Sequence, residues 1–368
     1  MLRVAGFASL RCLVLLFLLH PFAGLARSQD KTDAPKPGYP TDPKARKTFD
    51  DAVAWQKNRK LGSAMDTYRK ANHQDGGHCS ECLQRAFDLA IKIGAFKDAE
   101  EVARDMTPLA STSDEKSLAH FRLASALQHE GINNRKNTKC FADSCVELRA
   151  ALDAKPGLAL AHYSLGVSLA HLNQDEEARR EFTAFVDQDK SNGDLHDRAM
   201  RYLENIELAR ARMAPPFSLV SLDGQRVSLD GLAGKVVLID FWATWCGPCR
   251  EALPQIQKLA KKFDGQPFAI ISISLDSDDQ KWRDFVEKNG MTWLQYRDNA
   301  STGRIAMQFG VTAIPSTFTI DSDGVLEDQH VGEASIEGKI KKLVARAAEA
   351  PAHKPAEISA EKSAPSSQ

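Results

Sequence analysis

The sequence lacks an excess of charge of either sign. Its 368 residues include 48 lysines and arginines against 49 aspartates and glutamates, so the formal net charge is −1. A chain without surplus positive charge has no electrostatic basis for binding a nucleic acid. We therefore expect no DNA or RNA partner.

Long apolar runs are scarce, because only one uncharged stretch is long enough to matter for a membrane. This excludes a protein that crosses a membrane several times. The stretch has its apolar core at Cys12–Leu19, which is shorter than the roughly 20 residues that span a bilayer, and Gly24 and Ala26 follow it. Residues 1–26 are therefore predicted to be a signal peptide for export to the periplasm or another extracytoplasmic compartment. An uncleaved signal that tethers the protein to the membrane is the alternative.

Two other segments lack the residues that build a core. Residues 27–44 are rich in proline, aspartate, lysine and threonine, and are predicted to be a linker. Residues 351–368 contain a single large apolar residue, Ile358, and are predicted to be a disordered tail. The rest of the chain has an ordinary globular composition and is long enough for two or three domains.

Residues 45–213 show no strand-like alternation and are rich in alanine, leucine and charged residues. A period near 34 residues appears, most clearly in the unit from Ala159, where Leu165-Gly166 occupies the first helix and Ala178 and Phe182 the second. The small residues suit the crossing of two helices, and the larger ones fill the groove of the next pair. This pattern resembles the tetratricopeptide repeat.

Weaker units begin near Ala45, Ser80 and Ser117, with a loop insertion expected at Gly131–Asn137 and a capping helix at Leu195–Met213. The resemblance implies a concave surface that binds a protein or peptide partner. An unspecific helical bundle is the alternative.

Residues 214–350 have a different texture. Strand patterns alternate with helical spacing, and the predicted elements are a hairpin at 217–220 and 227–229, strands at 236–241, 268–275, 316–320 and 325–331, and helices after residue 249, at 281–288, at 302–309 and at 336–347. The strand at 236–241 is almost continuously apolar, as in a parallel sheet covered on both faces.

The sequence Trp245-Cys246-Gly247-Pro248-Cys249 lies between the first buried strand and a helix. Two cysteines at this spacing can close a disulfide, and the unpaired amides of a helix start stabilise a thiolate on the first sulfur. Cys246 is therefore predicted to be the attacking nucleophile and Cys249 the resolving thiol, while Pro248 fits the first helical turn. Half of a zinc site or a structural disulfide would leave Trp245 and the downstream Ile314-Pro315 unexplained.

The order of elements and these motifs resemble the thioredoxin fold, and the early hairpin and extra helix resemble TlpA/ResA-type exported proteins, over about Pro215 to Val344. The resemblance implies a cis peptide at Pro315, an Ile314 backbone that pairs with an extended client, and a Trp245 that shields the nucleophile. Trp242 is expected to be a packing residue.

Asp240 ends the buried strand six residues before Cys246, and its position resembles that of the buried thioredoxin aspartate. Desolvation would raise its pKa and allow it to accept the Cys249 proton. The alternative is an exposed aspartate at a strand end. Thioredoxin pairs its aspartate with a lysine on the next strand, whereas residues 268–275 contain no basic residue.

The other cysteines form two close pairs, Cys79/Cys82 and Cys140/Cys145, and are expected to be structural disulfides in an exported protein. A second redox centre at Cys79/Cys82 and a zinc site of all four thiolates, with His78 as an alternative ligand, are the other interpretations. No histidine directly follows Cys82, so covalent haem attachment is not supported.

The predicted fold class is an all-α repeat array followed by an α/β thioredoxin fold, and the predicted function is exported thiol–disulfide exchange on protein disulfides without metal or organic cofactor. Gly247-Pro248 is the dipeptide of reducing thioredoxins, which implies a membrane-borne electron donor. A peroxiredoxin-like peroxide reductase is the runner-up, although Ala243 and Ile239 replace the threonine and proline of that motif. A repeat scaffold with a vestigial redox domain is the third interpretation.

Overall fold

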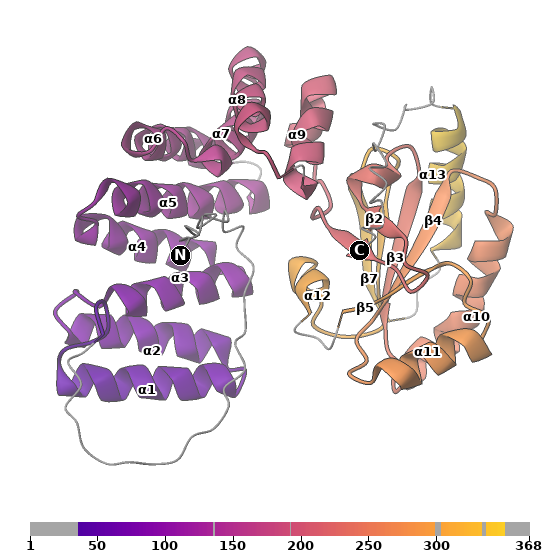
Figure 1. Cartoon of the computed structure of the whole chain (residues 1–368), viewed down its shortest axis with the longest axis horizontal. Coiled ribbons are helices and arrows are strands. Elements are labelled where there is room, and N and C mark those ends of the chain that lie inside the picture. Colours follow the sequence, from indigo (N-terminus) through magenta and orange to yellow (C-terminus); the bar gives the residue numbers. More distant parts are fainter. Residues whose placement is uncertain (1–35, 135–136, 192, 299–302, 333–335, 350–368) are drawn as a thin grey trace, which may run out of the picture. The chain divides into compact units, whose positions relative to one another are not determined.

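The computed structural model describes residues 36–134, 137–191, 193–298, 303–332 and 336–349 (Figure 1). The predicted signal peptide, the first half of the predicted linker and the predicted tail lie outside the described residues. Within the described ranges, no helix is both long and apolar enough to cross a membrane.

The first part of the described chain is a series of helices in which each helix packs on the next (Figure 1). The short turns between them are typical of antiparallel helical neighbours. The helices are α1 (Pro43–Lys57), α2 (Leu61–Gln74), α3 (Ser80–Ile93), α4 (Phe96–Met106), α5 (Ser113–Asn133), α6 (Lys139–Ala154), α7 (Ala159–His171), α8 (Asp175–Gln188) and α9 (Asp194–Glu204).

Close helix crossings explain two glycines of this array. A Cβ atom on Gly166 would lie 2.8 Å from the ring of Phe182, which is fully buried. Gly131 meets the ring of Phe141 in the same way, at 2.9 Å. The loop insertion predicted from Gly131 is therefore wrong at its start, because α5 continues to Asn133 to bring Gly131 under this ring.

Two other predicted boundaries need correction. α1 begins at Pro43, inside the predicted linker, because the Asp42 side chain caps it by accepting the backbone N–H groups of Lys44 and Ala45. The predicted capping helix ends at Glu204 instead of Met213. Asn205 adopts an extended backbone, and its side chain begins a short 3₁₀ helix, η2 (Ile206–Arg210).

The second part is a five-stranded mixed sheet of order β5-β4-β3-β6-β7, with a separate hairpin β1-β2. β3, β4 and β5 run parallel, while β6 and β7 are antiparallel to their neighbours. The strands are β1 (Ser218–Val220), β2 (Arg226–Ser228), β3 (Val236–Trp242), β4 (Phe268–Ser274), β5 (Leu294–Arg297), β6 (Ser316–Ile320) and β7 (Leu326–Val331). The predicted strands are confirmed, but β5 was not predicted.

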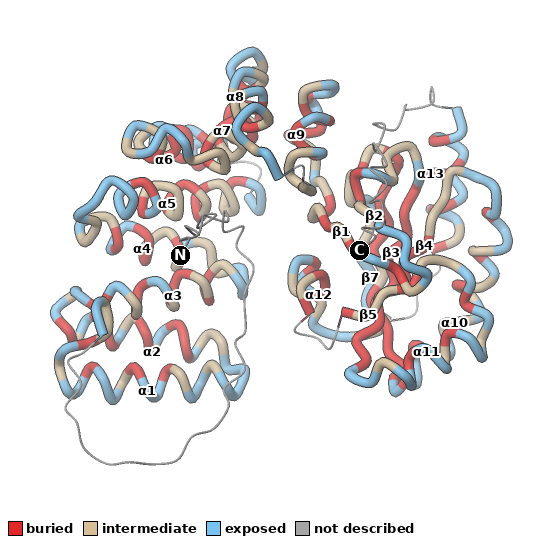
Figure 2. Tube along the Cα trace, viewed as in Figure 1, coloured by how far each residue is buried: buried red, intermediate tan, exposed pale blue. Residues whose placement is uncertain are grey.

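Helices on both faces bury the central strands, and every residue of β3 is buried (Figure 2). Val236 and Leu238 pack against Ile256 and Leu259 of α10, whereas the alternate residues Val237 and Ile239 belong to the core of the opposite face. The helices are α10 (Gly247–Lys262), α11 (Asp279–Lys288), α12 (Arg304–Gln308) and α13 (Glu337–Glu349), with a 3₁₀ turn η3 (Asp230–Leu232). The predicted fold class is confirmed.

A buried ion pair links α9 to η3. Arg198 is 2% exposed and donates from Nε to Asp230 at 2.7 Å, and Arg201 donates to the same carboxylate oxygen at 2.9 Å. Removing one partner from such a pair would leave an uncompensated buried charge, which is strongly destabilising.

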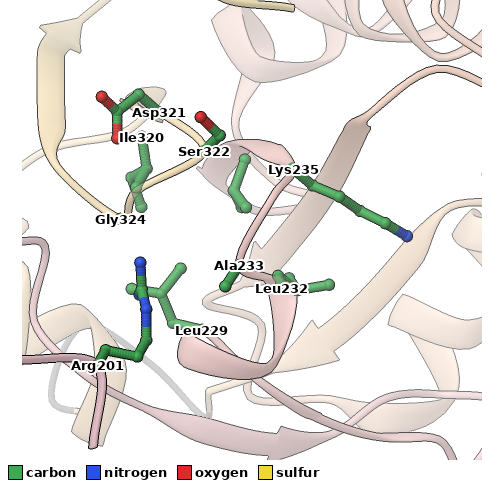
Figure 3. Close-up of a pocket in the computed structure, with 10 residues that line it drawn as sticks. Arg201, Leu229, Leu232, Ala233, Lys235, Ile320, Asp321, Ser322 and Gly324 are labelled. Atoms are coloured by element: carbon green, nitrogen blue, oxygen red, sulfur yellow. The ribbon is translucent and has the colours of Figure 1, made fainter. Parts of the chain in front are cut away.

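A small hollow, too shallow to enclose a water molecule, lies beside Arg201 and is lined also by Lys235, Ile320 and Gly324 (Figure 3). Lys235 immediately precedes β3, and Ile320 ends β6. The predicted cysteine motif follows the other end of β3. The hollow and the cysteine pair therefore lie at opposite ends of β3.

Candidate active site

The first cysteine of the motif caps a helix. α10 begins at Gly247, and Cys246 is its N-cap, with the backbone N–H of Cys249 donating to Cys246 Sγ at 3.2 Å. The two sulfurs form a disulfide of 2.03 Å. A thiolate formed at Cys246 on reduction would accept the same amide and lie at the positive end of the helix dipole.

The loop that carries Cys246 is tied to the end of β4. Asp276, which is 2% exposed, accepts the backbone N–H of Thr244 at 2.9 Å and the Thr244 hydroxyl at 2.7 Å. The Ser274 hydroxyl also donates to this carboxylate at 2.7 Å. Sequence reasoning missed Asp276. The sequence did contain a signal for it. Asp276 follows the predicted strand at 268–275, and the ends of neighbouring parallel strands meet at one side of a sheet, so a carboxylate there lies near the loop that follows β3.

The Ile314–Pro315 peptide is cis, as the resemblance implied. The Ile314 carbonyl oxygen lies 3.9 Å from Cys246 Sγ, and the Pro315 carbonyl accepts the backbone N–H of Gly332 at 2.8 Å. The structure therefore places the predicted proline loop directly beside Cys246 Sγ.

The two tryptophans of the motif differ. Trp242 is 4% exposed and packs among Cys246, Cys249 and Trp282, as expected of a core residue. Trp245 is 64% exposed, so it presents an aromatic surface next to Cys246 in the chain. A Cβ atom on Gly247 would meet no atom within 4 Å, so packing does not require a glycine at this position.

Asp240 is buried, which excludes the alternative of an exposed aspartate at a strand end. Burial raises the pKa of Asp240 to about 7, and a hydrogen bond from the Ser272 hydroxyl, at 3.3 Å, opposes this rise. Ser272 occupies the position directly opposite Asp240 on β4. It is the neighbour on the strand where thioredoxin carries a lysine.

The remaining cysteines do not behave alike. Cys79 and Cys82 form a disulfide at the start of α3, and both are fully buried. Cys140 and Cys145 are free thiols, so the predicted disulfide between them is wrong. Both lie on α6, and five residues turn a helix by about 140° beyond one full turn, which directs their sulfurs to different faces. Burial raises the pKa of Cys145 to about 11, so its thiol stays protonated.

The zinc interpretation requires the four array cysteines to meet. Cys79 and Cys82 belong to one hydrophobic cluster and Cys145 to another. Across the residues that the structure describes, no group of three or more histidine, cysteine, aspartate or glutamate side chains is arranged to hold a metal ion.

Comparisons with known proteins agree with this geometry. The Redoxin family matches residues 209–345. Thiol-disulfide oxidoreductase ResA of Bacillus thuringiensis (strain Al Hakam) is 33% identical over 145 residues, which are 39% of this chain and 83% of that protein. Thioredoxin-like protein YneN of Bacillus subtilis (strain 168) is 33% identical over 132 residues, which are 35% of this chain and 75% of the relative.

A solved structure of a thiol-disulfide oxidoreductase from Bacteroides fragilis NCTC 9343 is 28% identical, with a TM-score of 0.33, and covers 36% of this chain and 98% of that one. The Redoxin match begins at residue 209, after α9.

Proposed function

Because the chain belongs to the ResA-type thiol-disulfide oxidoreductases, we propose that it is an exported reductase of protein disulfides that acts through Cys246 and Cys249. One observation carries the proposal. The disulfide lies at a helix start with its first sulfur 3.9 Å from the Ile314 carbonyl, where an extended client backbone would run.

The reaction starts from the reduced pair. The Cys246 thiolate attacks one sulfur of the client disulfide, forms a mixed disulfide and releases one client thiolate, which takes a proton from water. The Cys249 thiol then gives its proton to a base, and its thiolate attacks Cys246 Sγ. The second client thiolate leaves, so two electrons have passed to the client and the Cys246–Cys249 disulfide is formed.

We assign the role of that base to Asp240. Side chains two residues apart on a strand share a face, so Asp240 lies on the same face of β3 as Leu238 and Trp242. Leu238 packs against α10, and Trp242 packs against Cys249. A carboxylate with a pKa of about 7 can take up and release a proton at neutral pH.

The Gly247-Pro248 dipeptide supports a reducing direction of electron flow. A thioredoxin-like pair has a potential of about −270 mV, so in an oxidising compartment it must be re-reduced after each turnover. We propose a membrane-borne electron donor for this step. Export itself is proposed from the sequence of residues 1–26.

We propose that residues 45–213 form a tetratricopeptide-type domain that binds a client or partner protein, and that residues 214–350 form the redox domain. The Gly166–Phe182 crossing supports this assignment, because it pairs the small and aromatic positions of the repeat signature. The exposed side chains Trp55, Ile93 and Leu118 on helices of the array are available for such contacts.

The test compares two activities of one purified sample. We expect the reduced protein to reduce insulin disulfides and to consume hydrogen peroxide slowly. Rapid peroxide consumption without insulin reduction would favour the peroxiredoxin-like alternative, and inactivity in both assays would favour the scaffold.

Trapping tests the two roles of the cysteines. We expect Cys249→Ser to accumulate mixed disulfides with client proteins, because the second step cannot occur, whereas Cys246→Ser should accumulate none. The species are counted on non-reducing gels, and equal trapping by both variants would overturn the assignment.

A further inference from the structure

A row of polar side chains crosses the sheet beneath the active site. Strand register places Thr317 of β6, Asp240 of β3, Ser272 of β4 and Gln295 of β5 side by side. In both parallel and antiparallel pairs, directly opposite residues point to the same face. This face is the one on which Leu238 packs against α10, so the row lies in an otherwise apolar layer.

The hydrogen-bond chemistry of Ser272 fixes the direction of its hydroxyl. The indole Nε1–H of Trp293 lies 2.8 Å from Ser272 Oγ, and an indole can only donate. Ser272 Oγ therefore accepts from Trp293, and its single proton remains available for Asp240 Oδ2 at 3.3 Å. Ser272 is fully buried, so bulk water does not compete for this proton.

The charged side chains of the helices that pack on this face do not form ion pairs with Asp240. On α10, Arg250 and Glu251 are exposed, and the lysines of α13 are exposed as well. Asp276, a buried carboxylate two residues beyond the end of β4, accepts hydrogen bonds from Thr244 and Ser274. The Ser272 hydroxyl is the one group whose hydrogen bond favours the charged form of Asp240 among the described residues.

We propose that Ser272 and Trp293 are positioning residues that hold a hydrogen bond on the Asp240 carboxylate and so keep it a competent acceptor for the Cys249 proton. This inference rests on the proposed function. When Cys249 Sγ loses its proton to Asp240, the S–H bond breaks and a carboxyl O–H bond forms. The Ser272 hydroxyl keeps its own proton and stabilises the carboxylate before the transfer. The neutral Ser272 hydroxyl thereby supplies part of the stabilisation that a buried lysine would give to the carboxylate.

The proposal predicts the direction of each substitution. Removing a hydrogen bond from a carboxylate favours its protonated form, so Ser272→Ala should raise the pKa of Asp240, by about one unit. Trp293→Phe leaves the hydroxyl but frees its orientation, and should move the pKa in the same direction by less. Thr317→Val is the matched control, because Thr317 faces Asp240 from the other neighbouring strand without a hydrogen bond to it.

The experiment separates the two thiol steps by using Ellman's disulfide on the reduced full-length protein. The first equivalent of coloured thiolate reports the attack of Cys246, and the second equivalent reports the intramolecular attack of Cys249. We expect the rate of the second phase to rise with pH with an inflection near 7, the pKa of Asp240. In Ser272→Ala the inflection should move up by about one unit, which makes the second phase about fivefold slower at pH 7 and nearly unchanged at pH 9.

Three results would overturn the inference. They are a Ser272→Ala profile that superimposes on the parent profile, a slowing that is equal at every pH, or a Thr317→Val shift as large as that of Ser272→Ala. If Ser272→Ala does not fold, as judged by circular dichroism, an unmoved inflection in Trp293→Phe has the same force. A parent protein that fails to reduce insulin would contradict the proposed function instead, so the two failures are distinguishable.

Discussion

The chain contains two Cys-x-x-Cys pairs, and each pair lies at the start of a helix with the same hydrogen-bond geometry. Cys79 caps α3 as Cys246 caps α10, and each first sulfur accepts the amide of the second cysteine, at 3.1 and 3.2 Å. Both pairs are disulfides. The spacing and the helix dipole therefore give no reason for the two pairs to differ in reactivity.

Access separates the two pairs. Cys246 and Cys249 are each 6% exposed and lie beside the Pro315 loop and the exposed Trp245, whereas Cys79 and Cys82 have no exposed surface. The array pair is packed in the core around Leu83, and Asn72 accepts the backbone N–H of Cys79 at 3.1 Å. We therefore expect a client sulfur to reach Cys246 more readily than Cys79.

The two pairs also differ in the pKa of the carboxyl group that lies near each pair in the sequence. Asp75 lies four residues before Cys79, and although burial pushes its pKa up, hydrogen bonds from the backbone N–H groups of Asp42 and Thr41 and from the Thr41 hydroxyl lower it overall. Asp75 therefore stays ionised near neutrality. Asp240 has one hydroxyl donor, so burial dominates and raises its pKa to about 7. Of these two carboxyl groups, Asp240 is the one whose pKa allows it to gain and lose a proton near neutral pH.

The largest expected effect is on activity. Cys246→Ser removes the proposed nucleophile and should lower insulin reduction by about two orders of magnitude or more. Replacing both Cys79 and Cys82 with alanine should leave the initial rate within about twofold of the parent, because neither sulfur reaches a client. A comparable loss in the double variant would show that the array pair is a second redox centre.

Asp240 should make stability depend on pH. Its pKa is higher in the folded protein, about 7, than the ordinary value of 3.8, so the folded state binds the extra proton between these values. The stabilisation is complete below about pH 4 and is lost as pH rises through 7. Relative to Asp240→Asn, the oxidised parent should lose about 3 kcal/mol of unfolding free energy between pH 5 and pH 8.

Urea titrations of both proteins at the two pH values measure this difference. Asp75→Asn provides the contrast, because a lowered pKa stabilises the folded state above the ordinary value and the stabilisation is lost on acidification. Asp75→Asn should therefore be destabilised relative to the parent at pH 7 and approach it in acid. Parallel pH profiles for parent and Asp240→Asn would contradict a buried, raised Asp240.

The Cys79–Cys82 disulfide should contribute to the free energy of unfolding of the helical array. A disulfide that closes a loop of about four residues stabilises a protein by about 2 kcal/mol, mainly by restricting the unfolded chain. Replacing Cys79 and Cys82 with alanine should lower the stability of the helical array by that amount, as measured by circular dichroism during urea unfolding. Cys140→Ala and Cys145→Ala serve as controls for cavity effects, because these thiols close no loop. Equal stability with and without the pair would show that the bond is not structural.

The sequence revealed the fold class and the position of the redox motif because both depend on local pattern. Cys246, Cys249 and the preceding strand are contiguous, and helical spacing needs only neighbouring residues. β5 was missed because Leu294–Arg297 is short and follows no clear alternation, so its pairing with β4 decides its structure. The start of the Gly131 loop was misjudged for a related reason, since the ring that packs on this glycine lies on another helix.

Contacts between neighbouring strands could not be predicted from the sequence, because they depend on strand register. The absence of a lysine on β4 was visible, but the residue opposite Asp240 could be named only once register was known. Trp293 reaches Ser272 across 21 residues, and Asp276 reaches Thr244 across 32. Likewise, spacing alone made Cys140 and Cys145 resemble a disulfide pair. Their position on one continuous helix excludes it.

The smallest expected effect is a separation of two midpoint potentials. The Cys246–Cys249 pair, with Gly247-Pro248 between its cysteines, should titrate near the thioredoxin value of about −270 mV. The fully buried Cys79–Cys82 pair should be a structural disulfide with a potential below about −300 mV, a gap that corresponds to at least about 1.4 kcal/mol. Equilibration in dithiothreitol buffers, followed by alkylation and peptide mass spectrometry, reports each pair separately. A midpoint of Cys246–Cys249 near −120 mV would reverse the direction of electron flow, because the stabilised thiolate would make the protein a donor of disulfides.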